Sequence, residues 1–206
     1  MNAQEVAIEA CQRAKPFLTP GITEKAFAEI CEQQMLALGA EGLWYPMLVN
    51  FNTNSIYCTR GGHLPSEDVI LQPADIVLID FSPMVQGLWG DYSETIVIGD
   101  APDFHRLADA AKRIFEQTYR YAAACRTIGE LFDYAHDLIV KDGYELLDPN
   151  GNIGHSITNY NNQDQRIYLC PENRDIELAG QKWAIEPHIG MGGYGAKFEN
   201  VIDRSI

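Results

Sequence analysis

Two acidic residues interrupt apolar, strand-like segments at residues 75–98 and limit how this stretch can fold. Asp80 ends the run DIVLID and Asp91 opens the run DYSETIVI, with Gly87 and Gly90 in the turn between them. Two strands joined in this way form a hairpin that brings both carboxylates close together. One such Asp is ordinarily a turn cap or a loop acid. Two in one apolar hairpin need a compensating positive charge, because buried charge is costly.

The pattern returns near the end of the chain. Glu186 follows Ile185 and Glu199 follows Phe198, with a Gly-rich turn between them. In addition, His155 stands among apolar residues in GNIGHSI, where a histidine satisfied within the core is the plainer alternative. Four acids and one His, without a thiolate, form a ligand set typical of hard or borderline divalent cations. We therefore predict a metal centre.

Composition limits the choice of partner and compartment. The 206 residues carry 29 acidic against 15 basic side chains, a net charge of −14, which disfavours nucleic acid and anionic membranes as partners. The five cysteines are widely spaced and lack a C-x-x-C pair, so we expect mostly reduced, buried thiols. The N-terminal residues show no signal-peptide pattern, and no apolar stretch approaches a membrane span. We expect a cytoplasmic protein.

Helical periodicity and β-branched runs alternate along the chain. Apolar spacing predicts helices over residues 2–16, 23–38, 103–124 and 127–142, and strands over the runs rich in β-formers, including DIVLIDF and ETIVIGD. We expect one α+β domain over residues 1–206, with helices packed outside a strongly curved, mainly antiparallel sheet.

A weak internal repeat accompanies this order. A shift of 104 residues places Thr23 on Thr127 and Gly39 on Gly143, and two helices precede strands in each half. Such a match suggests a duplication with halves of about 1–102 and 103–206, although so few matches also arise by chance.

The order of these residues resembles that of metallopeptidase family M24, which includes methionine aminopeptidases, aminopeptidase P and prolidase. The resemblance covers essentially the whole chain and implies the pita-bread fold with two pseudo-equivalent halves. It implies that Asp80 chelates one divalent ion, that Asp91 and Glu199 bridge two, and that His155 and Glu186 bind the other. Mn, Co, Fe and Zn all suit such a site.

The resemblance also implies a mechanism. A hydroxide bridging the two ions would attack a scissile carbonyl, and Glu186 would move the proton. His63, in GGHLP, resembles the family histidine that contacts the substrate; a surface turn histidine is the alternative.

The chain departs from the family pattern at two places. Asn161 and Asn162 stand where a second active-site histidine is expected, so Asn162 becomes a candidate substrate contact that cannot shuttle protons. His188 lies two residues past Glu186, on the same strand face, and either substitutes for the missing histidine or packs in the core. Lys197 stands where the prolidase branch has Arg, and cannot reproduce its bidentate geometry.

The leading prediction is a dinuclear metal-dependent hydrolase, an aminopeptidase or Xaa-Pro-type peptidase. The short thirteen-residue step from Glu186 to Glu199 resembles the Xaa-Pro branch. Trp44, Tyr45 and Trp89 are candidate substrate contacts, with core or turn packing as the alternative. Two further functions stay open: a non-peptide C–N (amide) hydrolase, and a catalytically impaired binding module. The expected partner is a peptide or small amide, and a homo-oligomer stays open.

Overall fold

The computed structural model describes residues 1–57, 62–157 and 165–205. Helices and antiparallel strands alternate in the order that the sequence predicts, so the α+β class is confirmed. The helices are α1 (Ala3–Ala14), α2 (Glu24–Ala37), α3 (Pro102–Ala122) and α4 (Ile128–Lys141), with short 3₁₀ turns η1 (Lys15–Phe17), η2 (Asn52–Ile56) and η4 (Pro171–Asn173). The strands are β1 (Gly42–Leu43), β2 (Leu48–Phe51), β3 (Asp75–Phe81), β4 (Pro83–Val85), β5 (Leu88–Trp89), β6 (Tyr92–Ile98), β7 (Glu145–Leu146), β8 (Gly154–Ile157), β9 (Lys182–Ile185), β10 (Ile189–Met191), β11 (Tyr194–Ala196) and β12 (Asn200–Asp203).

The second helix of each pair begins at a threonine cap. The Thr23 side chain accepts a hydrogen bond from Ala26 N. The Thr127 side chain accepts one from Glu130 N, and the Glu130 side chain accepts one from the backbone N–H of Thr127, which completes a capping box. Such caps satisfy amide groups that the first helical turn leaves unpaired. These are the two threonines that the 104-residue shift superimposes.

Strand pairing follows the same order in both halves of the chain. The first half forms the sheets β2-β3-β6 and β1-β4-β5, and the second forms β8-β9-β12 and β7-β10-β11, all antiparallel. Adding six to each strand number of the first half therefore gives the second half. A duplicated unit would produce this correspondence, and we keep the duplication and the single-domain organisation as proposals.

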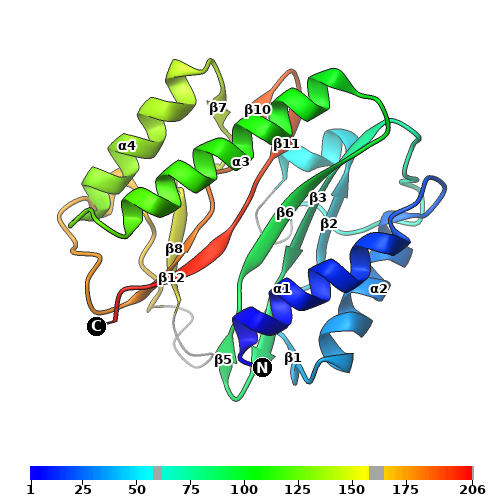
Figure 1. Ribbon diagram of the computed structural model, residues 1–206, viewed down its shortest axis with the longest axis horizontal. Helices are drawn as coiled ribbons and strands as arrows, with labels where there is room; N and C mark the ends of the chain where they lie inside the picture. Colours follow the sequence, from blue (N-terminus) through cyan, green and yellow to red (C-terminus); the bar gives the residue numbers. More distant parts are fainter. Residues whose placement is uncertain (58–61, 158–164, 206) are drawn as a thin grey trace.

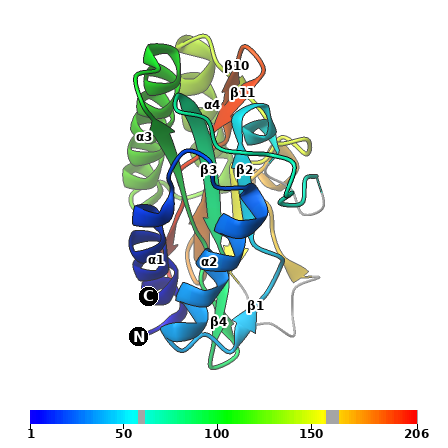
Figure 2. The same cartoon turned by 90° about the vertical axis from the view of Figure 1, so that its right-hand side faces the viewer.

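Each pair of helices covers its own set of strands. Figure 1 shows α1 and α2 beside β2 and β3, and α3 and α4 over the strands of the second half. In the view of Figure 2, α1 and α3 lie along one side of the molecule. Neither α1 nor α3 covers the opposite side of the strands.

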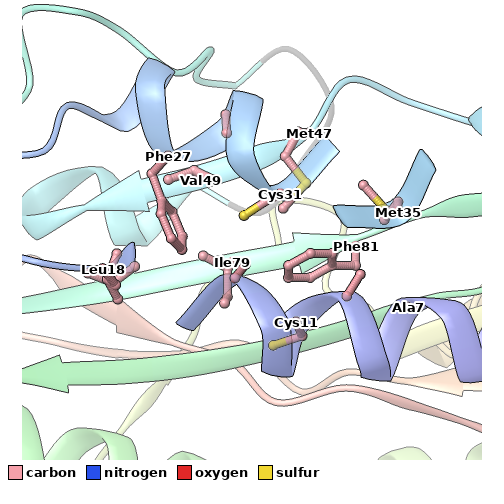
Figure 3. Packing of buried hydrophobic residues seen from close by; sticks show 14 of the residues in the cluster. Ala7, Cys11, Leu18, Phe27, Cys31, Met35, Met47, Val49, Ile79 and Phe81 are labelled. Atoms are coloured by element: carbon pink, nitrogen blue, oxygen red, sulfur yellow. The ribbon is translucent and has the colours of Figure 1, made fainter. Parts of the chain in front are cut away.

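The apolar faces of α1 and α2 pack on β2 and β3. In Figure 3, Cys11 of α1 and Cys31 of α2 lie on either side of Ile79 and Phe81. Burying such side chains stabilises the fold by about 1.5–3 kcal/mol each. All four cysteines in the described residues (Cys11, Cys31, Cys125 and Cys170) are buried and free, as expected for reduced thiols. The fifth, Cys58, lies outside them.

Hydrogen bonds join the two halves beside the acidic residues. Glu199 N donates to Ser93 O at 3.0 Å, and Thr95 bonds the backbone of Lys197 twice, at 2.8 and 2.9 Å. Gln4 binds the backbone N–H and C=O of Asp91 at 2.9 and 2.8 Å, and its Nε2 also donates to Asn200 Oδ1 of the second half at 2.9 Å. The acids of the two hairpins therefore meet where the halves meet.

Within the described residues, none of the helices combines the length and the apolar character that crossing a lipid bilayer demands.

We predict that Gly154→Ala weakens the fold more than Gly151→Ala does. Both glycines have positive φ, but a Cβ on Gly154 would lie 2.1 Å from Ala184 O, whereas none of the described atoms lies within 4 Å at Gly151. Gly151→Ala should lower the free energy of unfolding by about 1–2 kcal/mol. Gly154→Ala should also lose β8–β9 hydrogen bonds of about 1 kcal/mol each. Urea unfolding measures both, and equal losses would contradict the close approach.

Candidate metal centre

Asp80 and Asp91 converge because of strand register. Asp80 pairs with Ser93 across β3 and β6, and Asp91 is two residues from Ser93, so alternation places both carboxylates on one face. Both residues are 2% exposed. Tyr45 Oη donates to Asp80 Oδ1 at 2.5 Å and lies 3.4 Å from Asp91 Oδ1. The predicted hairpin is confirmed, with the small β4–β5 hairpin inserted between its strands.

Glu186 and Glu199 meet in the same way in the second half. β9 and β12 pair with Ile185 opposite Asn200, which sets the two glutamates side by side at the strand ends. Glu199 is 1% exposed, whereas the side chain of Glu186 keeps 17% of its surface accessible. Glu186 is therefore the most accessible of the four acids.

His155 reaches these acids from β8. Its Nε2 lies 3.3 Å from Asp91 Oδ2 and 3.6 Å from Glu186 Oε1, while Nδ1 lies 3.1 Å from Ser156 O. This arrangement directs Nε2 toward the carboxylates. The five residues predicted as ligands therefore lie in one cluster.

A basic residue lies among the acids as well. Lys197 is 1% exposed, and its Nζ donates to Asp80 Oδ2 and Glu186 Oε2 at 2.7 Å and to Glu199 Oε2 at 3.2 Å. These short charge-assisted bonds are strong because they are shielded from water.

Burial and mutual repulsion shift the protonation of the cluster. Burial raises the pKa of Asp80 to about 6 although Lys197 opposes the change, and burial with Asp91 and Glu186 raises the pKa of Glu199 well above its ordinary value. Burial would raise the pKa of Glu186 too, but Lys197 and His155 hold it below its usual value. The repulsion among the acids calls for more positive charge than Lys197 supplies.

Two groups of ligand atoms could hold a cation. Asp91, His155 and Glu199 form one, and Asp80, Glu186 and Glu199 form the other, each with its atoms within 4.8 Å of one another. Within the part of the chain that is described, Asp91 Oδ2 has the His155 Nε2 contact at 3.3 Å, and Glu199 Oε1 is buried without a hydrogen-bond partner. Buried oxygens of this kind need a cation or a donor, so the first group fits a divalent ion.

The cluster opens into a cavity of about 240 Å³. Trp44 and Tyr45 line it, with their rings 4.3 Å apart, and their contact with a substrate stays a prediction. Trp89 does not line the cavity but packs behind Trp44 at a ring separation of 4.1 Å. His188 lines the cavity too, from the segment between β9 and β10.

His188 is held as a neutral imidazole. Burial, followed by the charge of Lys197, lowers its pKa to about 3. Its Nε2 lies 2.9 Å from Ser55 O, so Nε2 carries the proton that it donates to this carbonyl. His188 therefore offers no positive charge to the cluster near neutral pH.

Two predicted substrate contacts have a different outcome. His63 does not line the cavity, and its Nε2 lies 2.6 Å from Glu24 Oε2 and 3.2 Å from Asn54 Nδ2. The fully buried Glu24 carboxylate therefore binds this imidazole, and the substrate contact of His63 stays a prediction. Asn161 and Asn162 lie outside the described residues.

Comparison with known proteins agrees with this geometry. The model of metallopeptidase family M24 matches residues 1–202. The chain belongs to metallopeptidase family M24. A methionine aminopeptidase of Archaeoglobus fulgidus is 24% identical over 204 residues, covering 97% of this chain and 67% of that protein.

Solved structures of M24 proteins share the pita-bread fold. The X-Pro aminopeptidase from Thermotoga maritima MSB8 superposes with a TM-score of 0.80 at 19% identity, covering 99% of this chain and 59% of that one. Dipeptidase PepE from Mycobacterium ulcerans superposes with a TM-score of 0.78 at 26% identity, covering 97% of this chain and 52% of that one. The present chain thus spans little more than half of each.

Two residues near the proposed metal ligands of this M24 chain were not predicted as site residues from its sequence. Lys197 lies between β11 and β12, two residues before Glu199, and this spacing is the signal that could have indicated it. Arg166 lines the cavity with its Cζ 5.1 Å from the Trp44 ring centre and 5.5 Å from that of Tyr168. Arg166 follows a polar segment without strand periodicity, so no sequence pattern indicated it.

We predict that a divalent ion stabilises this M24 chain by binding the cluster. At a free Mn²⁺ concentration 100 times the dissociation constant, the free energy of unfolding should rise by about 2.7 kcal/mol. For a chain of this size, the melting temperature should rise by roughly 5–10 °C. Thermal unfolding with chelator and with Mn²⁺ measures this difference.

Asp91→Asn should abolish most of the shift, and Asp109→Asn on the exposed side of α3 should leave it intact. A shift of equal size in both variants would show that the ion acts elsewhere.

Proposed function

We propose that this chain is a divalent-metal-dependent exopeptidase that releases the N-terminal residue of short peptides. The observation that carries the proposal is the cluster of four acids and one His at the base of a small cavity lined by Trp44 and Tyr45. A cavity of about 240 Å³ suits one or two residues of a peptide rather than a folded protein. Family membership supports the same reaction class.

The ligand residues of the proposed centre are Asp80, Asp91, His155, Glu186 and Glu199, which together could hold up to two ions. A bound divalent ion supplies a Lewis acid for the scissile carbonyl and lowers the pKa of a nearby water. Glu186 is the proposed proton acceptor, because its lowered pKa keeps it ionised and its side chain is the most accessible of the acids.

Trp44, Tyr45 and His188 shape the cavity around the substrate. Tyr45 stays protonated, because burial and then the charge of Asp80 raise its pKa well above the ordinary value. Its hydroxyl therefore continues to donate to Asp80 and fixes that carboxylate. The buried indole of Trp44 excludes water from one wall.

Arg166 supports a preference for substrates with a free carboxylate. Its guanidinium lies against the rings of Trp44, Trp89 and Tyr168, and its Nε is buried without a hydrogen-bond partner within the described residues. A guanidinium held in this way binds a carboxylate through two parallel hydrogen bonds. The C-terminal carboxylate of a dipeptide fits this requirement, so we propose dipeptides, including the Xaa-Pro type, as substrates.

The metal, the partners and the cellular location are proposed on chemical grounds. Carboxylates with one His accept Mn, Co, Fe or Zn, and a non-peptide amide of similar size would meet the same cavity. The net charge of −14 supports the absence of nucleic-acid and anionic-membrane partners. We propose a cytoplasmic location, and a homo-oligomer is compatible with the proposal.

We predict that the chelator-treated chain hydrolyses dipeptides only after Mn²⁺, Co²⁺ or Zn²⁺ is restored. Asp91→Ala should reduce kcat/KM by at least about a thousandfold, because it removes a ligand of the proposed centre. Asp109→Ala is the matched control and should retain full activity. A screen of Met-Ala, Ala-Pro and the corresponding longer peptides measures the rates. The absence of cleavage with every ion would contradict the peptidase proposal.

We further predict that Arg166→Met lowers kcat/KM for a dipeptide by about 10- to 100-fold, the value of one or two charged hydrogen bonds. The loss should appear mainly in KM, and the same dipeptide with a C-terminal carboxamide should be unaffected. Arg120→Met, at an exposed site on α3, is the control. Equal losses for the acid and the amide would reject carboxylate binding by Arg166.

A further inference from the structure

Lys197 is built firmly into the acidic cluster. Its backbone N–H and C=O both bond Thr95 Oγ1, at 2.8 and 2.9 Å, and its side chain is fully enclosed. Because Lys197 and Glu199 are two residues apart, both side chains extend to the same face. The ammonium group is therefore delivered to the cluster by the segment between β11 and β12, which also supplies Glu199.

The ammonium contacts the same three residues that form one of the two cation-binding groups. Asp80, Glu186 and Glu199 each give Lys197 Nζ one oxygen, at 2.7, 2.7 and 3.2 Å. The other oxygen of Asp80 already accepts from Tyr45 Oη. A divalent ion in this group would need the same oxygens and would be repelled by the ammonium, since both are positive.

The other group shares only Glu199 with these contacts. Lys197 Nζ bonds Glu199 at the longer distance of 3.2 Å, whereas Asp91 Oδ2 lies 3.3 Å from His155 Nε2. Glu199 Oε1 is buried and, within the described residues, has no hydrogen-bond partner. The two groups thus differ, because a lysine ammonium lies against all three acids of the first, whereas Asp91 of the second faces an imidazole that can itself bind a metal.

We propose that Lys197 takes the place of one of the two cations, so that each chain binds a single divalent ion tightly, at Asp91, His155 and Glu199. The inference rests on the proposed metal-dependent function and refines its metal content. A second ion binds only by displacing the ammonium, which must break the charge-assisted hydrogen bonds described above. The chain is therefore a one-metal protein built from a two-metal ligand set.

The test is the number of ions bound per chain and does not depend on activity. The chelator-treated wild-type chain and Lys197→Met are titrated with Mn²⁺ by calorimetry, and the bound metal is counted by mass spectrometry. The wild-type chain should hold one ion and Lys197→Met two. The dissociation constant of the second ion should be at least about tenfold lower in the variant. Lys182→Met, which removes an exposed ion pair with Asp203, should stay at one ion.

A second measurement on the unaltered chain covers the case in which Lys197→Met does not fold. Electron paramagnetic resonance of the Mn²⁺-loaded wild-type chain should show the six-line signal of an isolated ion. A spin-coupled pair in that spectrum, or two tightly bound ions in the wild-type titration, would overturn the inference. One ion in both the wild type and Lys197→Met would overturn it as well. No bound ion in any protein would remove the proposed function, and the inference with it.

Discussion

Four carboxylates in one buried cluster are the constraint on which the rest of this structure depends. Asp80 and Asp91 come from the first half of the chain, and Glu186 and Glu199 come from the second. Without positive charge among them, their repulsion would oppose the meeting of the two halves. Lys197 supplies part of that charge, and the buried oxygens of Asp91, beside His155, and of Glu199 mark where more is required. The same balance of charges therefore determines both the site and the packing of the two halves.

The fold brings these acids together by using the same strand geometry in each half. Each acidic pair lies on two antiparallel strands whose register sets the carboxylates on one face, and the helices cover the strands from outside. Gly154 allows β8 to approach β9 closely, which brings His155 to the acids. The aromatic wall of Trp44 and Tyr45 then separates the cluster from bulk water, which strengthens every charge interaction inside it.

Much of this could be predicted from the sequence, because it depends on short-range patterns. The periods of 3.6 and 2 indicated the helices and strands, and acids at the ends of apolar runs indicated the ligands. The contact of His63 with the buried Glu24, 39 residues earlier, could not be predicted, because GGHLP contains no sign of it. Arg166 was missed because its environment comes from Trp44, Trp89 and Tyr168, which only the fold assembles.

Lys197 shows most clearly which features the sequence determines and which the tertiary structure determines. The sequence by itself determined the residue types that bind divalent cations, their order, and the alternation that places Lys197 on the face of Glu199. Only the tertiary structure decided that this ammonium lies between Asp80 and Glu186, residues 117 and 11 positions away. The physical reason is that hydrogen bonding and alternation act between neighbours, whereas charge compensation acts between whichever groups the packed strands bring within a few ångströms of one another.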